Sequence, residues 1–138
     1  MAKAIPDGYH SVTPHLIVKG ADRAIDFYKK VFGAAQRMRM DGPNGTVGHA
    51  EIEIDGSTIM LADEFPDMGF RSPKSIGGTS VSLHLYVQDV DACFNRAVAE
   101  GAKALRLVED QFYGDRSGTV EDPFGHVWTI STHKEDLS

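Results

Sequence analysis

The sequence predicts an α+β domain built from two tandem copies of one β-α-β-β-β module, and three observations support this. The stretch "HLIVKGAD" (15–22) returns almost unchanged as "HLYVQDVD" (84–91). A helical pattern follows each copy and closes at a Gly-Ala pair, Gly33-Ala34 and Gly101-Ala102. Each module then ends in a glycine turn and a strand-like run, "STIML" after Gly56 and "HVWTI" after Gly125.

Length and composition limit the class of protein. A chain of 138 residues is long enough to bury a core as a single domain. The formal net charge of −6 argues against nucleic acid as a partner, because phosphate binding requires a basic surface. No apolar run approaches the roughly 20 residues that span a bilayer, so no membrane association is expected. The single cysteine and the polar start "MAKAIPDGYH", without a signal-peptide pattern, favour a cytoplasmic location.

The first module covers about residues 11–64. A strand is predicted at 12–18, with Val12, Leu16 and Val18 facing the core and Thr13 and His15 on the other face. A helix is predicted at 21–33, and further strands at 35–40, 49–54 and 57–63. The Asp55-Gly56 pair predicts a tight hairpin between the last two strands.

The second module covers about residues 80–134 and follows a segment, 64–79, that reads as a linker or flap. Its predicted elements are a strand at 81–87, a helix from Asp89 to Gly101, strands near 105–108 and 119–122, a loop at 109–118 and a strand at 126–132. The helix is expected to bury Val90, Cys93, Phe94, Ala97 and Val98. Residues 134–138 read as a polar tail.

The two copies are expected to present matching polar residues on one sheet face. His15 and His84 occupy equivalent strand positions, two residues beyond Thr13 and Ser82. Aligning Gly48–Glu51 with Gly118–Glu121 makes Glu51 and Glu121 the repeat's matched acidic pair.

The segments "AIDFYKKVFGA" (24–34) and "DPFGHVW" (122–128) resemble landmarks of the vicinal oxygen chelate superfamily, of the glyoxalase/bleomycin resistance protein/dioxygenase type. The runs "GHAEIEI" and "DQFYGDRSG" resemble its PhnB-like subgroup. The resemblance implies curved mixed sheets around a central pocket for a small molecule. It also implies that modules pair within one chain or across a swapped dimer, so a homodimer is expected.

The same resemblance implies four inward positions for a divalent metal, which fall here on Thr13, Met60, Ser82 and Thr129. Hydroxyls and a thioether are poor ligands for such an ion, so no cofactor is expected at these positions. The alternative is a displaced metal site that uses His15, His84 and a carboxylate such as Glu51.

Each polar pocket residue has a structural and a functional interpretation. The two histidines either line the pocket through hydrogen bonds or perform acid–base chemistry, with Tyr86 beside His84 as a donor. Glu51 and Glu121 either form salt bridges, to Arg37 or Arg116, or act as a base or as an anchor for a cation. Arg116 either staples its loop or holds a carboxylate or phosphate. The full predicted pocket comprises Thr13, His15, His49, Glu51, Met60, Ser82, His84, Tyr86, Arg116, Glu121 and Thr129.

Two functional hypotheses follow. The first is a metal-free protein of the bleomycin-resistance kind that binds or sequesters a small molecule. The rival is a glyoxalase-like lyase, isomerase or transferase. That enzyme would use a displaced metal or acid–base catalysis by His84, Tyr86 and Glu51. A protein-binding module with a vestigial pocket fits less well, since the inward face remains polar.

Overall fold

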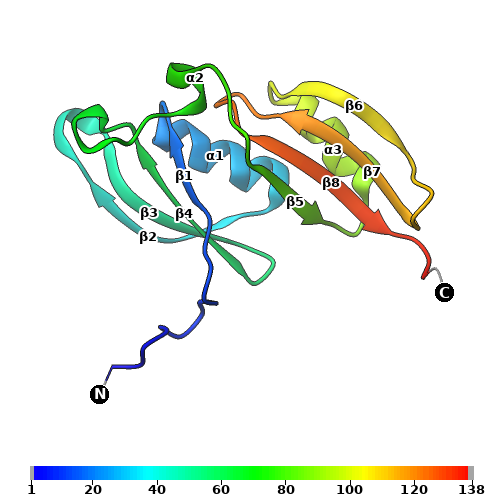
Figure 1. Ribbon diagram of the computed structural model, residues 1–138, viewed down its shortest axis with the longest axis horizontal. Helices are drawn as coiled ribbons and strands as arrows, with labels where there is room; N and C mark the ends of the chain where they lie inside the picture. Colours follow the sequence, from blue (N-terminus) through cyan, green and yellow to red (C-terminus); the bar gives the residue numbers. More distant parts are fainter. Residues whose placement is uncertain (1, 137–138) are drawn as a thin grey trace. The chain divides into compact units, whose positions relative to one another are not determined.

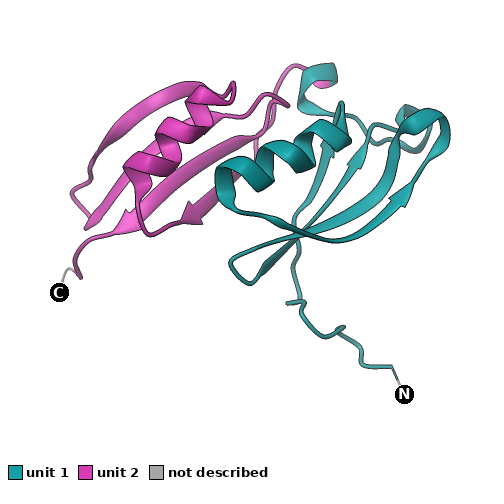
Figure 2. Cartoon of the chain, turned by 180° about the vertical axis from the view of Figure 1, so that it is seen from behind, with its two compact units in different colours: residues 1–75 teal, residues 76–138 magenta. Residues whose placement is uncertain are grey.

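The computed structural model describes residues 2–136 and divides the chain into two compact units, residues 1–75 and 76–138. In each unit a helix lies across one face of a four-stranded sheet (Figure 2). Both sheets are mixed, and in each the first strand of the unit pairs with its fourth, which is followed by the third and then the second (Figure 1). The predicted α+β class and its two β-α-β-β-β modules are confirmed.

The first unit contains one long helix and three short helical turns besides its sheet. Its elements are β1 (His15–Val18), α1 (Ala21–Phe32), β2 (Ala35–Asp41), η1 (Pro43–Gly45), β3 (Val47–Ile54), β4 (Ser57–Asp63), η2 (Pro66–Met68) and α2 (Pro73–Ile76). β1 runs parallel to β4, while β2, β3 and β4 form an antiparallel meander. Asp55 and Gly56 both have positive φ, as the two central residues of a tight hairpin turn require.

The core of the first unit lies between α1 and the sheet. Its apolar positions recur at helical spacing on α1 and alternate along the strands, so both elements present one apolar face. Asp63 at the end of β4 accepts hydrogen bonds from the backbone N–H groups of Gly20 and Ala21, at the start of α1. The buried side chains include Leu16, Val18, Ile25, Tyr28, Val31, Ala50, Ile52, Ile54, Ile59 and Leu61.

The second unit repeats this plan with β5 (Ser82–Tyr86), α3 (Val90–Ala99), β6 (Lys103–Asp110), β7 (Asp115–Glu121) and β8 (Val127–His133). Asp89 caps α3 as predicted, because its side chain accepts from the N–H of Ala92. The fully buried Asp122 fixes the turn before β8 by accepting from the N–H groups of Phe124 and His126 and from the indole of Trp128.

One prediction about the first unit needs correction. Val12 is 86% exposed rather than part of the core, because β1 begins only at His15. Pro14 lacks an N–H and enters the ladder only as an acceptor, through its carbonyl to Met60. The segment predicted as a linker or flap, residues 64–79, is held by contacts of its own. The Glu64 carboxylate accepts from Ser72 and Ser75, and Phe65 pairs with Phe70.

Two predictions about the second unit were also wrong. The region 109–118 is mostly strand, since β6 continues to Asp110 and β7 begins at Asp115. Only residues 111–114 form the turn between them. Val98 is 41% exposed, because it lies in the last turn of α3, at the edge of the face that buries Val90, Cys93, Phe94 and Ala97.

The ladders define which residues of the two units are equivalent. His15 is level with Met60 and His84 with Thr129, so the two histidines do occupy the same position in each unit. Glu51 is level with Met60, whereas Thr119 is level with Thr129. Glu51 therefore corresponds to Thr119, and the expected match of Glu51 with Glu121 was wrong. The reason is that the turn before β8 is longer than the Asp55-Gly56 turn. The longer turn shifts the alignment of the third strands of the two units. No helix within residues 2–136 is long and apolar enough to cross a bilayer.

Candidate functional site

A row of side chains crosses the first sheet on the face opposite α1. The ladders align Met38 with Glu51, Glu51 with Met60 and Met60 with His15. Laterally paired residues in a sheet point to the same side, so these four side chains share one face. We call this side of the sheet the open face of unit 1. Glu51 places one carboxylate between two methionines there.

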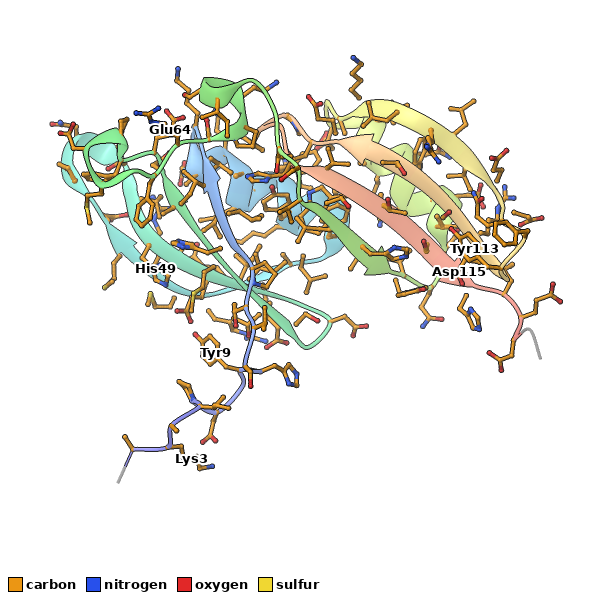
Figure 3. The ribbon with its side chains drawn as sticks, viewed as in Figure 1. Lys3, Tyr9, His49, Glu64, Tyr113 and Asp115 are labelled. Carbon is orange, nitrogen blue, oxygen red and sulfur yellow. The ribbon has the colours of Figure 1, made fainter. Side chains whose placement is uncertain are left out.

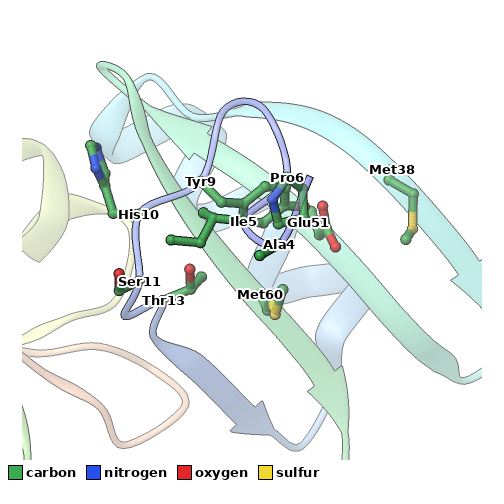
Figure 4. Close-up of a pocket in the computed structure, with 10 residues that line it drawn as sticks. All are labelled: Ala4, Ile5, Pro6, Tyr9, His10, Ser11, Thr13, Met38, Glu51 and Met60. Atoms are coloured by element: carbon green, nitrogen blue, oxygen red, sulfur yellow. The ribbon is translucent and has the colours of Figure 1, made fainter. Parts of the chain in front are cut away.

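A cavity of about 600 Å³ lies over the part of this row formed by Met38, Glu51 and Met60. Figure 4 shows that the N-terminal segment lines this cavity together with Glu51 and Met60. A turn closed by the hydrogen bond from the Tyr9 N–H to the Pro6 carbonyl shapes the segment, and the Thr58 hydroxyl fastens it by donating to the Gly8 carbonyl. The cavity volume lies within the range typical of small-molecule sites. Its lining comprises Ala4, Ile5, Pro6, Tyr9, His10, Ser11, Thr13, Met38, Glu51 and Met60.

Two histidines flank the carboxylate on the same face. The His49 imidazole lies 2.9 Å from a Glu51 oxygen, and its ring makes an edge contact with His15 at 5.7 Å between centroids. Phe70 covers another side of His15, with ring centroids 5.8 Å apart. Partial burial, and secondarily the neighbouring His49, lowers the pKa of His15. The neutral form of His15 is therefore favoured near pH 7.

The corresponding open face of unit 2 carries hydroxyls and imidazoles. His84 Nε2 lies 2.9 Å from the hydroxyl oxygen of the buried Ser131, and the His84 ring lies 4.8 Å from the ring of Tyr86. Ser82, Thr129 and Glu121 lie on this face as well, by their places in the ladders. Ser131 thus fixes one ring nitrogen of His84, while the His84 side chain remains exposed.

Asp115 anchors a second group of polar side chains on this face. It lies at the start of β7 (Figure 3), is 5% exposed, and accepts a hydrogen bond from the Tyr86 hydroxyl. His133 Nδ1 contacts its other oxygen at 2.7 Å, and His133 Nε2 contacts Asp136. The bond with His133 lowers the pKa of Asp115, and bonds with Asp115 and Asp136 raise the pKa of His133. The bond to Asp115 likewise raises the pKa of Tyr86.

The four positions that the family resemblance assigns to a metal do not fit a divalent ion. They carry the hydroxyls of Thr13, Ser82 and Thr129 and the thioether of Met60, and the Thr129 hydroxyl is hydrogen-bonded to that of Thr119. In residues 2–136, no three His, Cys, Asp or Glu side chains are grouped so as to hold a metal ion. The displaced-site residues are divided between the units, with His15 and Glu51 in the first and His84 in the second.

Arg116 requires a correction, because it does not face the open side of unit 2. It is level with Thr132, and its guanidinium binds Asp91 of α3 and Asp110 of β6. It therefore lies on the face that α3 covers, opposite to its neighbour Asp115. Arg37 pairs with Glu53 rather than with Glu51. The two salt bridges considered for Glu51 thus do not form.

Sequence reasoning missed several residues that the structure brings into these faces. Ile5, Pro6 and Tyr9 line the cavity, although the sequence places them before the first strand. Asp115 was assigned to a loop and His133 was given no role. Period-two spacing offered a signal for both, because Asp115 lies six residues before Glu121 and His133 four residues after Thr129.

Comparison with known proteins agrees with this architecture. A family model described as "Glyoxalase/Bleomycin resistance protein/Dioxygenase superfamily" matches residues 8–130. The uncharacterized protein Mb0911c of Mycobacterium bovis is 50% identical over 123 residues, which cover 87% of this chain and 81% of that protein. A family match over most of the chain, and a relative at this identity, show common descent rather than a shared fold alone.

Solved structures resemble the chain along nearly its whole length. The crystal structure of TioX from Micromonospora sp. ML1 superposes with a TM-score of 0.69 at 28% identity, covering 90% of this chain and 98% of TioX. A PhnB protein from Bacillus cereus, described as a putative 3-demethylubiquinone-9 3-methyltransferase, superposes with a TM-score of 0.71 at 20% identity, covering 89% and 99% of the two chains. The second likeness confirms the predicted PhnB-type fold.

Proposed function

Because the chain belongs to the glyoxalase/bleomycin resistance protein/dioxygenase superfamily, we propose that it is a cytoplasmic protein that binds or sequesters a small molecule without a metal ion. The observation that carries this proposal is the cavity of about 600 Å³ on the open face of unit 1. Pockets of this size bury most of the surface of a drug-sized molecule.

The lining of the cavity defines the chemistry of its ligand. Ile5, Met38 and Met60 supply apolar and adaptable surface, and Tyr9 supplies an aromatic ring. Glu51 is the carboxylate of the lining, and its side chain is only 14% exposed. A molecule with a flat apolar body and a cationic or strongly donating group satisfies both features, because it covers the methionines and pairs with the carboxylate.

The absence of ligand-type side chains at the usual positions supports a metal-independent mode of binding. A metal-dependent relative would hold its substrate through the ion, whereas Thr13 and Met60 here offer a hydroxyl and a thioether to the same cavity. Binding would then depend on shape, apolar contact and the charge of Glu51.

The test is a calorimetric titration with a panel of aromatic cations, including rhodamine 6G, and matched neutral and anionic dyes, including fluorescein. We expect the cations to bind and Glu51→Gln to weaken them by at least tenfold. Glu53→Gln is the matched control, because Glu53 lies on the same face and is paired with Arg37 outside the cavity lining. No binding across the panel, or equal affinity in the Glu51 variant, would contradict the proposed site.

An enzyme is the second candidate, and one observation favours it. His84 is fixed by Ser131 and Tyr86 by Asp115, which holds two proton-transfer groups side by side on the open face of unit 2. The reaction would be a glyoxalase-like lyase, isomerase or transferase step. Turnover that disappears in His84→Ala while ligand affinity is retained would support catalysis over binding alone.

A further inference from the structure

We propose that Tyr9, on the N-terminal segment of residues 2–10, selects aromatic over saturated ligands in the cavity of unit 1. This role rests on the proposed function, since the ligand is that of the same cavity. The family match begins only at residue 8, so the lining residues before it lie outside the family pattern. Five of the 10 lining residues belong to the N-terminal segment (Figure 4), namely Ala4, Ile5, Pro6, Tyr9 and His10.

The turn that carries Tyr9 holds this residue partly buried. Within residues 2–10, Tyr9 is half-buried and every other residue is exposed. The Tyr9 N–H donates to the Pro6 carbonyl at 3.2 Å, and Gly8 has a φ of 84°. Glycine tolerates this left-handed conformation, which brings the chain into the turn at Tyr9. The Tyr9 hydroxyl makes no hydrogen bond with any of residues 2–136, so the ring and the hydroxyl are both available to a ligand.

Glu51 and Tyr9 supply different parts of ligand recognition. One Glu51 oxygen contacts His49 at 2.9 Å, and the other has no hydrogen-bond or ion-pair partner in residues 2–136. A carboxylate attracts cations of equal charge with similar strength, because the attraction depends on charge and distance. An aromatic ring adds a preference for other aromatic rings, through offset-stacked or edge contacts. Glu51 therefore supplies affinity for the cation, and Tyr9 supplies the choice between an aromatic and a saturated body.

Within residues 2–136, a single hydrogen bond connects the N-terminal segment to the sheet. The Thr58 hydroxyl of β4 donates it to the carbonyl of Gly8, next to Tyr9, at 3.0 Å. The other hydrogen bonds and ion pairs that residues 2–10 make with described residues are internal, from Lys3 to Asp7 and within the turn at Tyr9. Segments held by few contacts open at a low free energy. Thr58 is therefore a positioning residue that keeps Tyr9 at the cavity.

Calorimetric titration with a matched pair of ammonium ions tests the selection. Naphthylmethylammonium and its saturated counterpart, decahydronaphthylmethylammonium, carry the same charge on bodies of similar size. We expect the unaltered full chain to bind the aromatic ion more tightly, and Tyr9→Leu to reduce that preference by about threefold or more. Tyr9→Phe should retain the preference, because the ring remains. Tyr113→Leu, which removes an exposed tyrosine of the second unit, is the matched control and should retain it as well.

Glu51→Gln separates the role of Tyr9 from the proposed function, because it should weaken both ions alike. If neither ion nor rhodamine 6G binds the unaltered chain, the proposed function fails and Tyr9 has no ligand to select. If both ions bind through Glu51 but Tyr9→Leu leaves the ratio of their affinities unchanged, the role of Tyr9 is overturned while the site stands. An equal change in Tyr113→Leu would overturn it too. Thermal melts of each variant verify that it is folded.

Stopped-flow fluorescence of rhodamine 6G tests the connection through Thr58. Thr58→Val keeps the shape of the side chain and removes its donor, so we expect the dye to dissociate about threefold faster or more. Thr46→Val is the matched control, because the Thr46 hydroxyl also donates to a backbone carbonyl, that of Pro43, outside the cavity lining. Equal dissociation rates in the two variants would overturn the positioning role of Thr58.

Discussion

The hydroxyl of Tyr86 donates a 2.9 Å hydrogen bond to the carboxylate of Asp115, whose other oxygen contacts His133 at 2.7 Å. Strands β5, β7 and β8 each contribute one of these residues. The buried carboxylate therefore connects three of the four strands on the open face of unit 2. The hydrogen bonds from Tyr86 and His133 favour the ionised form of Asp115, because a hydrogen bond to an ionised carboxylate stabilises its charge.

The His133–Asp115 pair predicts a pH dependence of stability. The pKa of His133 is raised above 6.5, so its contribution is complete below 6.5 and is lost as the pH rises through the raised value. The pKa of Asp115 is lowered below 3.8, so its contribution is complete above 3.8 and is lost as the pH falls through the lowered value. We expect His133→Gln to lower the melting temperature at about pH 5.5 more than at about pH 9, as measured by thermal denaturation.

A titration of the imidazole checks the cause of this dependence. In Asp115→Asn the pKa of His133 should fall toward its ordinary value, as followed by NMR of the ring nitrogens. Asp110→Asn is a control in the same unit, because Asp110 pairs with Arg116 rather than with a histidine. An unchanged His133 titration in Asp115→Asn would show that Asp136 alone raises its pKa.

The position of Gly118 in β7 has no room for a larger side chain. A Cβ atom there would lie 2.8 Å from Val108 Cγ2 and 2.9 Å from the ring of Phe94, a buried residue of α3. We expect Gly118→Ala to lower the free energy of unfolding by about 1–3 kcal/mol, as overpacking does. Gly48→Ala is the comparison, because its Cβ would find its nearest atom, the Met40 carbonyl oxygen, at 3.4 Å. Chemical denaturation should rank Gly118→Ala as the more damaging of the two.

Among replacements of polar residues, we expect that of Asp122 to cause the largest loss of stability. Asp122→Ala removes the acceptor of the buried Phe124 N–H and Trp128 indole N–H, and of the part-buried His126 N–H. Such groups are costly to bury unpaired, so we expect a loss of about 3 kcal/mol or more. Asp122→Asn retains one acceptor oxygen and should lose less. Trp128 is the single tryptophan, so its fluorescence reports the transition directly.

Metal analysis separates the two functional candidates further. We expect elemental analysis of the purified protein, before and after incubation with Zn, Ni and Mn, to find less than a stoichiometric ion. The donors at Thr13, Met60, Ser82 and Thr129 explain this expectation. A near-stoichiometric ion that disappears in the His15→Ala, His84→Ala double variant would establish a displaced site and favour an enzyme.

The fold was predictable because its signals are local. Alternation in "HAEIEI", the Asp55-Gly56 turn and the cap at Asp89 each depend on a few neighbouring residues, and each has the predicted structure. The internal repeat then supplied the order of strands in the second unit.

Side-chain direction was predictable only where a strand had been recognised. Arg116 and Asp115 are neighbours on opposite faces of β7, and assigning both to a loop removed the alternation that separates them. The cavity over Glu51 could not be predicted, because it brings the turn at Pro6–Tyr9 together with strands that are distant in sequence. Long-range contacts of this kind have no periodic signal.

The number of residues between His15 and its ladder partner Met60 equals the number between His84 and its partner Thr129. This equality has a consequence for folding kinetics. In each unit the meander forms from adjacent hairpins, whereas the first strand joins the sheet only after a long loop has closed. Loop-closure entropy depends on loop length, so both units face the same entropic barrier in this late step. The turns inside the meanders do differ, and Asp55-Gly56 gives the first unit the shorter connection, so its meander should close the faster of the two.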